Sequence, residues 1–332
     1  MKTTRLAWAS ALAAGAMVAA VALPGAAQSP SVPAASALTA PGKNITLMVG
    51  VKGDPFYVSM ECGARVAATA AGVNLDVQGP DKFDATLQNP MLDAVGAGKP
   101  DALLVAPNDR TASAGPLKTI QDGGAKIVLV DTIVDDPSIG VSRIATDNEL
   151  GGEKAAEALQ TLGLASGAKV LAISTDPGVS SVDARIEGFN KKAAEFGYTL
   201  VSDTQYSHNS AETAAQVVSA ALAANPDLAG VFATNLFTAQ GVATGVKQAG
   251  ATNVKVVGFD AGPDQVTQLQ AGDVQALVAQ EPYTIGLWGI QQAVAALNGA
   301  PVTAEIQTPS IVVTQDNLAD PEVAKFLYTS SC

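Results

Sequence analysis

The stretch Gly53-Asp54-Pro55-Phe56-Tyr57 joins a predicted strand, Ile45 to Gly50, to a predicted helix, Tyr57 to Ala71. In open α/β folds, ligands bind at such turns, beside the carboxyl ends of the strands. Nucleotide-binding proteins place glycines there so that the backbone can approach a phosphate. This turn instead carries a carboxylate, a proline and two aromatic rings. It therefore favours the apolar face of a small polyhydroxylated molecule over a phosphate.

Strand-like and helix-like segments alternate from residue 43 onward, with short polar connections. The strand-like segments are short, β-branched and continuously apolar, as in parallel sheets that are buried on both faces. They are Ile45–Gly50, Asn74–Gln78, Ala102–Ala106, Ile127–Val130, Lys169–Ile173, Thr199–Asp203, Gly230–Ala233, Val254–Phe259 and Ala276–Ala279. Helical periodicity lies between them, for example at Gly152–Thr161, Ala184–Phe196 and Ala211–Ala224. The alternation predicts an α/β fold with doubly wound, Rossmann-like parallel sheets, and 332 residues suit two such lobes.

The two halves of the chain resemble each other. Apolar strands end near Asn108 and Asn235, which are 127 residues apart, and at Asp131 and Asp260, which are 129 apart. Two copies of one fold would give this nearly constant spacing, although any two parallel strands look somewhat alike. Two such sheet edges facing each other would form a cleft lined with matched polar groups.

Six polar side chains end predicted strands or lie near the start of predicted helices: Asp54, Asp131, Arg185, Asn235, Asp260 and Gln280. The hydroxyls of sugars and polyols donate and accept hydrogen bonds, and planar carboxylate, amide and guanidinium groups suit them. The C–H faces of such ligands would pack on Phe56 and Tyr57. Each polar residue could instead cap a helix or form an ion pair, and Asn108 could reach the ligand or only form a turn.

The amino-terminal segment is typical of a cleavable secretory signal, residues 1–27. Lys2 and Arg5 give it a positive start, Leu6 to Leu23 an apolar run, and Pro24-Gly25-Ala26-Ala27 small residues before the cut. The alternative is an uncleaved membrane anchor. Residues 28–43 are rich in Ser, Ala and Pro, which predicts a disordered spacer. We expect the mature protein in the periplasm or otherwise outside the cytoplasm.

Charge and residue counts argue against several functions. The formal net charge is −12 and becomes −14 without the leader, which contains two cations and no acid. This argues against nucleic acid and anionic membranes as partners. One histidine and two distant cysteines cannot build a metal site, and no nucleophile with a paired base is evident. We therefore expect no metal, no cofactor and no catalysis.

The two cysteines, Cys62 and Cys332, lie in a predicted helix and at the chain terminus. Export makes a disulfide between them permissible. We predict this bridge, because an unpaired terminal thiol is a liability in an oxidising compartment. The alternative is a buried thiol at Cys62 and a free one at Cys332.

Six ordered motifs resemble bacterial periplasmic sugar-binding proteins of the ribose-binding type. They are Gly53–Met60 with Gly63-Ala64, Ala145–Gly152, Arg185–Phe189, Val231–Asn235, Val256–Asp264, and Ala279-Gln280 with Pro282 and Ile285-Gly286. Each motif alone is weak, but their order is specific, and the resemblance covers residues 44 to about 315. It implies a type I periplasmic-binding fold and a protein that delivers a small sugar or polyol to the membrane permease of an ABC importer.

The resemblance also implies a set of ligand-binding residues: Asp54, Phe56, Tyr57, Asp131, Thr132, Arg185, Asn235, Asp260 and Gln280. Four departures put ribose itself in doubt. Asp54 stands where ribose binders have Asn, Thr132 where they have Arg, and Gly50 where they have Ser. Leu236-Phe237 replaces an acidic residue, which makes Phe237 a further candidate beside Asn108. Another pentose, a deoxysugar or a linear polyol stays open.

The family fold implies two lobes, 44–146 plus 282–308 and 147–281 plus 309–332, joined by three crossings that act as a hinge. Closure would trap the ligand between the lobes, and we expect a monomer. Two other functions remain open from the sequence. One is an exported sensor that presents a sugar or furanose-like signal to a membrane receptor. The other is a glycosidase with Asp131 and Asp260 as its carboxylate pair.

Overall fold

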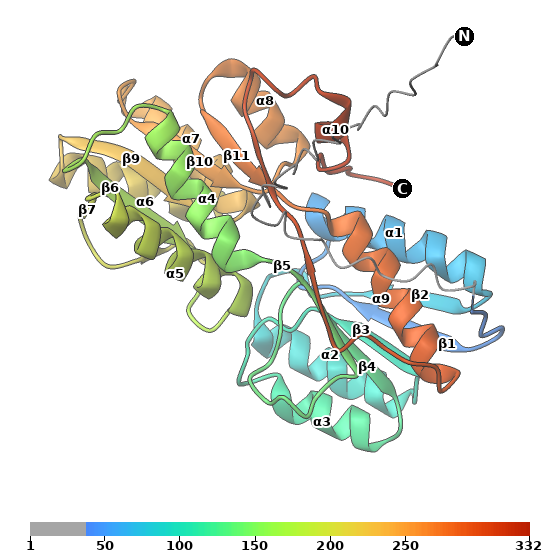
Figure 1. Cartoon of the computed structure of the whole chain (residues 1–332). Helices are drawn as coiled ribbons and strands as arrows, with labels where there is room; N and C mark the ends of the chain where they lie inside the picture. Colours follow the sequence, from blue (N-terminus) through green and yellow to red (C-terminus); the bar gives the residue numbers. More distant parts are fainter. Residues whose placement is uncertain (1–37) are drawn as a thin grey trace, which may run out of the picture. The chain divides into compact units, whose positions relative to one another are not determined.

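The computed structural model describes residues 38–332, so the predicted signal peptide, 1–27, lies outside the described residues. Two sheets with helices on both faces make up the fold (Figure 1). The first sheet is parallel throughout and runs in the order β12 (Glu305–Thr308), β5 (Ser142–Thr146), β4 (Lys126–Val130), β3 (Ala102–Val105), β1 (Asn44–Met48) and β2 (Asn74–Gln78).

The second sheet contains the middle of the chain and a short strand near its end. It runs in the order β13 (Ile311–Val313), β11 (Ala276–Ala279), β10 (Lys255–Phe259), β9 (Leu228–Ala233), β6 (Lys169–Ser174) and β7 (Thr199–Leu200), while β8 (Gln205–Tyr206) also pairs with β6. Only β13 is antiparallel to its neighbour among the described strands. The carboxyl ends of the parallel strands therefore share one edge in each sheet.

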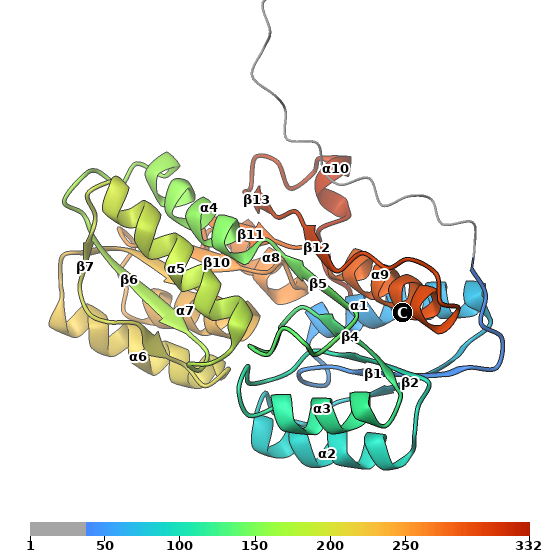
Figure 2. The ribbon, with the colours of Figure 1, turned by 60° about the horizontal axis from the view of Figure 1, so that its bottom comes forward.

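Helices cover both faces of the first sheet. Helices α1 (Pro55–Ala71) and α9 (Pro282–Leu297) lie on one face, and α2 (Ala85–Ala97) and α3 (Ala114–Asp122) lie on the other, as Figure 2 shows. Successive strand residues point to opposite faces. Leu104 accordingly packs in the cluster with α1 and α9, and its neighbour Leu103 packs in the cluster with α2 and α3.

The second sheet is covered in the same way. Helices α4 (Asn148–Thr161) and α5 (Ser180–Glu195) pack on one face, and α6 (Ala211–Ala224), α7 (Leu236–Gln248) and α8 (Pro263–Ala271) pack on the other. Val170 packs with α4 and α5, and Leu171 packs with α6 and α7. A short helix, α10 (Pro321–Ala324), precedes the C-terminus.

Glycines bring two helix pairs into close backbone contact. A Cβ at Gly63 of α1 would overlap the carbonyl oxygen of Tyr283 in α9, and one at Gly286 of α9 would overlap that of Met60 in α1. In the other half, Gly152 of α4 lies equally close to the carbonyl of Arg185 in α5. These helices can approach each other only because the glycines have no side chain.

The structure confirms the predicted α/β class and most predicted strands, and it differs at β5, β8, β12 and β13, which were not expected. Buried and less buried residues alternate along β5 and β12, so neither is the continuous apolar run used to find strands. The predicted strand Thr199–Asp203 is only two residues long before the chain bends. The described end of the predicted spacer 28–43 is ordered, because Ala40 is buried and donates to the Ala71 carbonyl at 2.9 Å.

The predicted Cys62–Cys332 disulfide is confirmed, and it connects the end of the chain to α1 of the first half. No helix within residues 38–332 is long and apolar enough to cross a membrane.

Candidate functional site

One pocket lies between the strand ends of the two sheets. It gathers eight of the nine residues that the family resemblance implied for ligand binding, all except Thr132, together with residues that the sequence did not indicate. Its lining consists of Asp54, Phe56, Tyr57, Phe83, Asp131, Thr175, Val179, Ser181, Val182, Arg185, Asn209, Asn235, Asp260 and Gln280. Both halves of the chain contribute, as the duplicated sequence pattern predicted.

The turn at the start of α1 supplies the aromatic side of the pocket. Asp54 is the N-cap of α1, and its Oδ1 accepts a hydrogen bond of 2.8 Å from the Phe56 amide. Pro55 occupies the first helical position, where the absence of an N–H has no cost. The rings of Phe56 and Tyr57 meet edge to face with centroids 5.1 Å apart. The cap thus fixes where the carboxylate and both rings lie.

Gly50, one of the departures from the ribose pattern, makes room for these rings. A Cβ at Gly50 would overlap Tyr57 Oη and would lie 2.6 Å from Cε2 of Phe83. Phe83 lies in the loop before α2 and adds a further ring to the pocket wall. A serine at position 50 would displace one of these two rings, so the observed positions of Tyr57 and Phe83 require a glycine at residue 50.

Asp131 and Asp260 occupy equivalent positions at the ends of β4 and β10. Their φ angles are 63° and 77°, in the left-handed region that residues other than glycine rarely adopt. Each backbone N–H donates 2.8 Å to a carbonyl of the neighbouring strand, Ile144 for Asp131 and Val278 for Asp260. Such strain persists only where the surrounding structure enforces it, and it concentrates at binding sites. The match supports the internal duplication.

Hydrogen bonds within the protein orient both carboxylates. Asp131 Oδ2 accepts 2.7 Å from Tyr57 Oη. Asp260 Oδ1 accepts from Gln280 Nε2 at 2.6 Å and from Tyr328 Oη at 2.8 Å. Thr146 Oγ1 in turn donates 2.6 Å to Gln280 Oε1. The second oxygen of each carboxylate has no hydrogen-bond donor among the described residues, so it can accept from a ligand.

Arg185 is the single buried cation of the pocket lining, and it is 3% exposed. Its Nε donates 2.8 Å to Asn148 Oδ1, and its Nη1 donates 2.8 Å to the Thr234 carbonyl. Its Cζ lies 3.7 Å from the centre of the Phe259 ring, which adds a cation–π contact. The surface ion pair that the sequence left open for this residue does not form.

Asn235 begins α7 and also lines the pocket. Its Oδ1 accepts from the backbone N–H of Thr238 at 3.3 Å, which makes it the N-cap of α7. Its Nδ2 donates 2.6 Å to Oδ1 of Asn209. The capping role that the sequence left open is thus realised, and the same residue still faces the pocket.

Three candidates lie outside this pocket lining. Thr132 is 1% exposed, and its hydroxyl donates 2.8 Å to the Pro107 carbonyl. Asn108 and Phe237 line an adjoining pocket that shares Phe83, Val179 and Asn209 with the first one. The structure therefore places Thr132 behind the site and Asn108 and Phe237 beside it.

Some lining residues could have been found from the sequence and others could not. Thr175 directly follows β6, so the strand-end rule applied elsewhere would include it. Ser181 and Val182 lie one helical turn before Arg185 and share its face. Phe83 and Asn209 lie in loops, and no periodic pattern marks them.

The pocket concentrates negative charge. Burial is the main cause that raises the pKa of Asp54 to about 7, and the nearby Asp260 adds to it. Burial also raises the pKa of Asp131 to about 6, against the lowering effects of Arg185 and of the Tyr57 hydrogen bond. Three carboxyls thus face one guanidinium, and neutral donors such as hydroxyls can stabilise them without adding charge.

This charge predicts an unusual pH dependence of stability. Asp54 and Asp131 have folded pKa values raised above the unfolded value of 3.8. Their protonation therefore favours the folded state, and that stabilisation is lost as pH rises through about 6 to about 7. We expect the melting temperature of the ligand-free protein to rise by roughly 5 °C from pH 8 to pH 5. Calorimetric melting of Asp54→Asn checks this, because the variant should lose most of the rise. A melting temperature that falls over the same range would contradict it.

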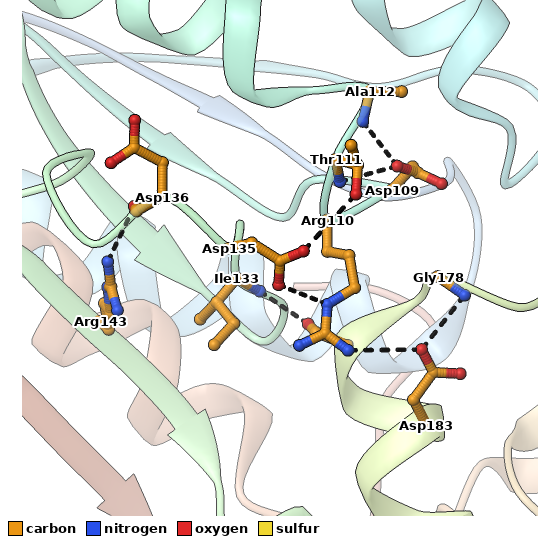
Figure 3. Close-up of polar contacts among 11 residues, drawn as sticks. Asp109, Arg110, Thr111, Ala112, Ile133, Asp135, Asp136, Arg143, Gly178 and Asp183 are labelled. Carbon is orange, nitrogen blue, oxygen red and sulfur yellow. Dashed lines mark hydrogen bonds and ion pairs between the residues drawn. The ribbon is translucent and has the colours of Figure 1, made fainter.

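The two halves also contact each other through residues outside the pocket lining (Figure 3). The Arg110 side chain donates 2.6 Å to Asp135 Oδ1 in its own half and lies 3.6 Å from Asp183 Oδ2 of α5. The Arg110 amide donates 2.9 Å to the Gly178 carbonyl, and the Ile133 amide donates 2.8 Å to Ser180 Oγ. The structure is thus in a conformation in which these segments of the two halves contact each other.

A pocket of this kind, between the strand ends of two sheets and lined by oriented polar groups, suits the binding of a small polar solute. The chain belongs to the periplasmic binding protein family, since the model of the "Periplasmic binding protein domain" matches residues 45–301. It is an extracytoplasmic solute-binding protein of the ABC-importer class and not an enzyme, so the glycosidase alternative is wrong.

Characterised relatives fit this assignment. The ribose import binding protein of Escherichia coli is 30% identical over 261 residues, 79% of this chain and 87% of that protein. The D-allose-binding periplasmic protein of the same species is 27% identical over 277 residues, 79% of this chain and 89% of that protein.

Solved structures are similar over nearly their whole length. A solute-binding protein from Agrobacterium vitis, bound with α-D-tagatopyranose, is 41% identical with a TM-score of 0.83, covering 86% of this chain and 99% of that one. A carbohydrate solute-binding protein from Agrobacterium radiobacter, in complex with D-arabinose, is 29% identical with a TM-score of 0.82 and the same coverage.

Proposed function

We propose that the protein binds one neutral monosaccharide in the pocket between the two sheets and delivers it to the permease of an ABC importer. The charge of the pocket is the observation that carries the proposal. Asp54, Asp131 and Asp260 surround a single cation, Arg185, so an anionic ligand such as a sugar phosphate would be repelled. Sugar hydroxyls can donate to the free carboxylate oxygens, and an unmatched buried partner would be costly.

The residues of the two halves take complementary roles in this proposal. Phe56, Tyr57 and Phe83 pack against the C–H face of the sugar, and Asp54 and Asp131 accept from its hydroxyls. Opposite them, Arg185 donates and Asp260 accepts, with Asn235 and Gln280 beside them. Thr132, in the loop after β4, is hydrogen-bonded to the carbonyl of Pro107 in the loop after β3, and it does not touch the ligand. Asn108 and Phe237 line the adjoining pocket.

Relatives narrow the sugars to be tested. The solved relative that carries α-D-tagatopyranose shares 41% of its residues with this chain, and other solved relatives carry D-fucose and D-arabinose. Curated relatives are named for ribose, allose and apiose. We propose that Asp54 and Gly50, which depart from the ribose pattern, shift the preference away from ribose. D-Tagatose is then the first sugar to test.

The mechanism that we propose is closure about a hinge. The lobes are residues 44–146 plus 282–308 and 147–281 plus 309–332, with crossings near 146–147, 280–281 and 307–309. Thr146, Gln280 and Thr308 come from these three crossings, and their side chains are hydrogen-bonded in series, 2.6 Å between the first two and 3.3 Å from Thr146 to Thr308. A ligand that contacts both halves shifts the population toward the closed form. We propose a monomer, exported to the periplasm by the leader 1–27.

A thermal-shift screen tests the proposed ligand class. The mature protein is heated with D-tagatose, D-ribose, D-allose, D-arabinose, D-fucose, linear polyols and ribose 5-phosphate. At 100 times the dissociation constant a ligand stabilises by about 2.7 kcal/mol, so we expect a neutral sugar to raise the melting temperature by several degrees. Stabilisation by ribose 5-phosphate alone, or by none of the compounds, would refute the proposal.

A further inference from the structure

The last residues of the chain, Phe326–Cys332, form a segment that we call the tail, and it contacts both halves of the protein. Its Tyr328 amide donates 3.1 Å to the carbonyl of Ala261, directly after Asp260. The Thr329 amide donates 2.9 Å to Ser59 Oγ in α1, and Cys332 is bonded to Cys62 in the same helix. The tail thus connects α1, which carries the aromatic turn, to the strand ends of the second sheet.

Tyr328 lies directly behind the binding pocket. It is 7% exposed, and its Oη donates 2.8 Å to Asp260 Oδ1 and accepts 3.3 Å from the Gln280 amide. Its ring meets that of Phe56 edge to face, with centroids 5.7 Å apart. One side chain therefore touches three pocket residues while it is not part of the pocket lining itself.

We propose that Tyr328 is a positioning residue of the sugar site and that the Cys62–Cys332 disulfide holds it there. The tyrosine hydroxyl occupies one side of the Asp260 carboxylate, so the other oxygen is directed into the pocket. The hydroxyl also accepts a hydrogen bond from the backbone N–H of Gln280. The side-chain amide of Gln280 donates to the same Asp260 carboxylate. Residues 329–332 are exposed, so burial does not hold the end of the tail, and the disulfide does.

The tail is also a further connection between the two halves, in addition to the three proposed crossings. The tail is bonded covalently to α1 through the disulfide. It also makes two hydrogen bonds, through Tyr328, to Asp260 and Ala261 of the other half. Without the disulfide, the tail would have to be ordered at each binding event, which costs conformational entropy. Preorganisation of this kind raises affinity without adding a contact to the ligand.

Two variants and their combination test the proposal: Tyr328→Phe, which removes only the hydroxyl, and the double variant Cys62→Ser/Cys332→Ser. With D-tagatose or the tightest-binding sugar of the screen, calorimetry should show binding weakened at least tenfold by each. If the disulfide acts through Tyr328, the combined variant should be weakened clearly less than the product of the two effects. Tyr283→Phe, an exposed tyrosine in α9, is the matched control and should leave the affinity unchanged.

Affinity measured on the folded protein separates positioning from a merely structural role. At a temperature where both proteins are fully folded, Tyr328→Phe should bind the sugar more weakly than the wild type, because its hydroxyl no longer orients the Asp260 carboxylate. A lower melting temperature with unchanged affinity would overturn the proposal.

This proposal rests on the proposed function. A measurement made without ligand tests the two separately. The backbone amide hydrogen of Gln280, which donates to Tyr328 Oη, should exchange with solvent at least tenfold faster in Tyr328→Phe and in the cysteine double variant. NMR measures this exchange rate. Unchanged exchange in both variants would overturn the role of the tail, whether or not any sugar binds.

Discussion

Asp260→Ala is expected to weaken sugar binding by about a thousandfold. The substitution removes the carboxylate at the end of β10, which is 4% exposed and whose free oxygen accepts from the ligand in our proposal. Truncation of a buried, hydrogen-bonded charge typically costs 2–5 kcal/mol, and about 4 kcal/mol is a factor of about a thousand. It also leaves Tyr328 Oη and Gln280 Nε2 without their acceptor. Calorimetric titration of wild type and variant measures the loss.

Asp264→Ala is the matched control for this change. Asp264 lies four residues further on, in the first turn of α8, and is exposed. It carries the same charge, so its removal changes the net charge equally but leaves the pocket intact. We expect its affinity within a factor of about two of wild type, since surface substitutions rarely exceed 0.5 kcal/mol. Equal affinities for Asp260→Ala and Asp264→Ala would remove Asp260 from the site.

Gly152→Ala is expected to lower both stability and affinity. The added Cβ would overlap the Arg185 carbonyl and lie 2.8 Å from the Phe189 amide, so α4 and α5 would have to separate. Neither neighbour is a flexible side chain that could move away. Overpacking of this kind costs about 1–3 kcal/mol, occasionally more, and we expect the upper part of that range. Because α5 carries Arg185, its displacement also weakens the contacts of the guanidinium with Asn148 and Thr234.

Gly115→Ala provides the control for a helical glycine. Gly115 lies in α3, and a Cβ there would meet nothing within 4 Å. Alanine is the better helix former, so we expect the free energy of unfolding to stay the same or to increase slightly. Denaturant melts of the two variants compare them directly. A Gly152→Ala protein as stable as Gly115→Ala would show that the helix pair is more loosely packed than described.

The sequence predicted the strands that are buried on both faces, because a continuous apolar run marks them. Strand β5 was not expected, since polar and apolar residues alternate in Ser142–Thr146. Strand β12 was missed for the same reason, and it pairs with β5 at the edge of the sheet. Edge strands depend on pairing with their neighbour more than on their own composition. That pairing joins residues far apart in the chain, so local pattern reasoning cannot find it.

The pocket could be predicted where its residues follow strands. Asp131 and Asp260 follow β4 and β10, and parallel strands bring their carboxyl ends to one edge, so the strand-end rule leads to residues that line the pocket. Thr132 also follows β4, but its hydroxyl turns to the Pro107 carbonyl, which depends on the exact path of a neighbouring loop. Tyr328 gave no signal at all. It lies in the tail, which a disulfide with a sequence separation of 270 joins to α1.

The most direct test of a sugar site between the two sheets is a calorimetric titration of the mature protein with the tightest-binding sugar of the screen. The site predicts one sugar bound per chain, recovered chemically unaltered after release, and binding lost in Asp260→Ala but kept in Asp264→Ala. Absence of saturable binding of any neutral sugar, or binding that Asp260→Ala leaves intact, would contradict it.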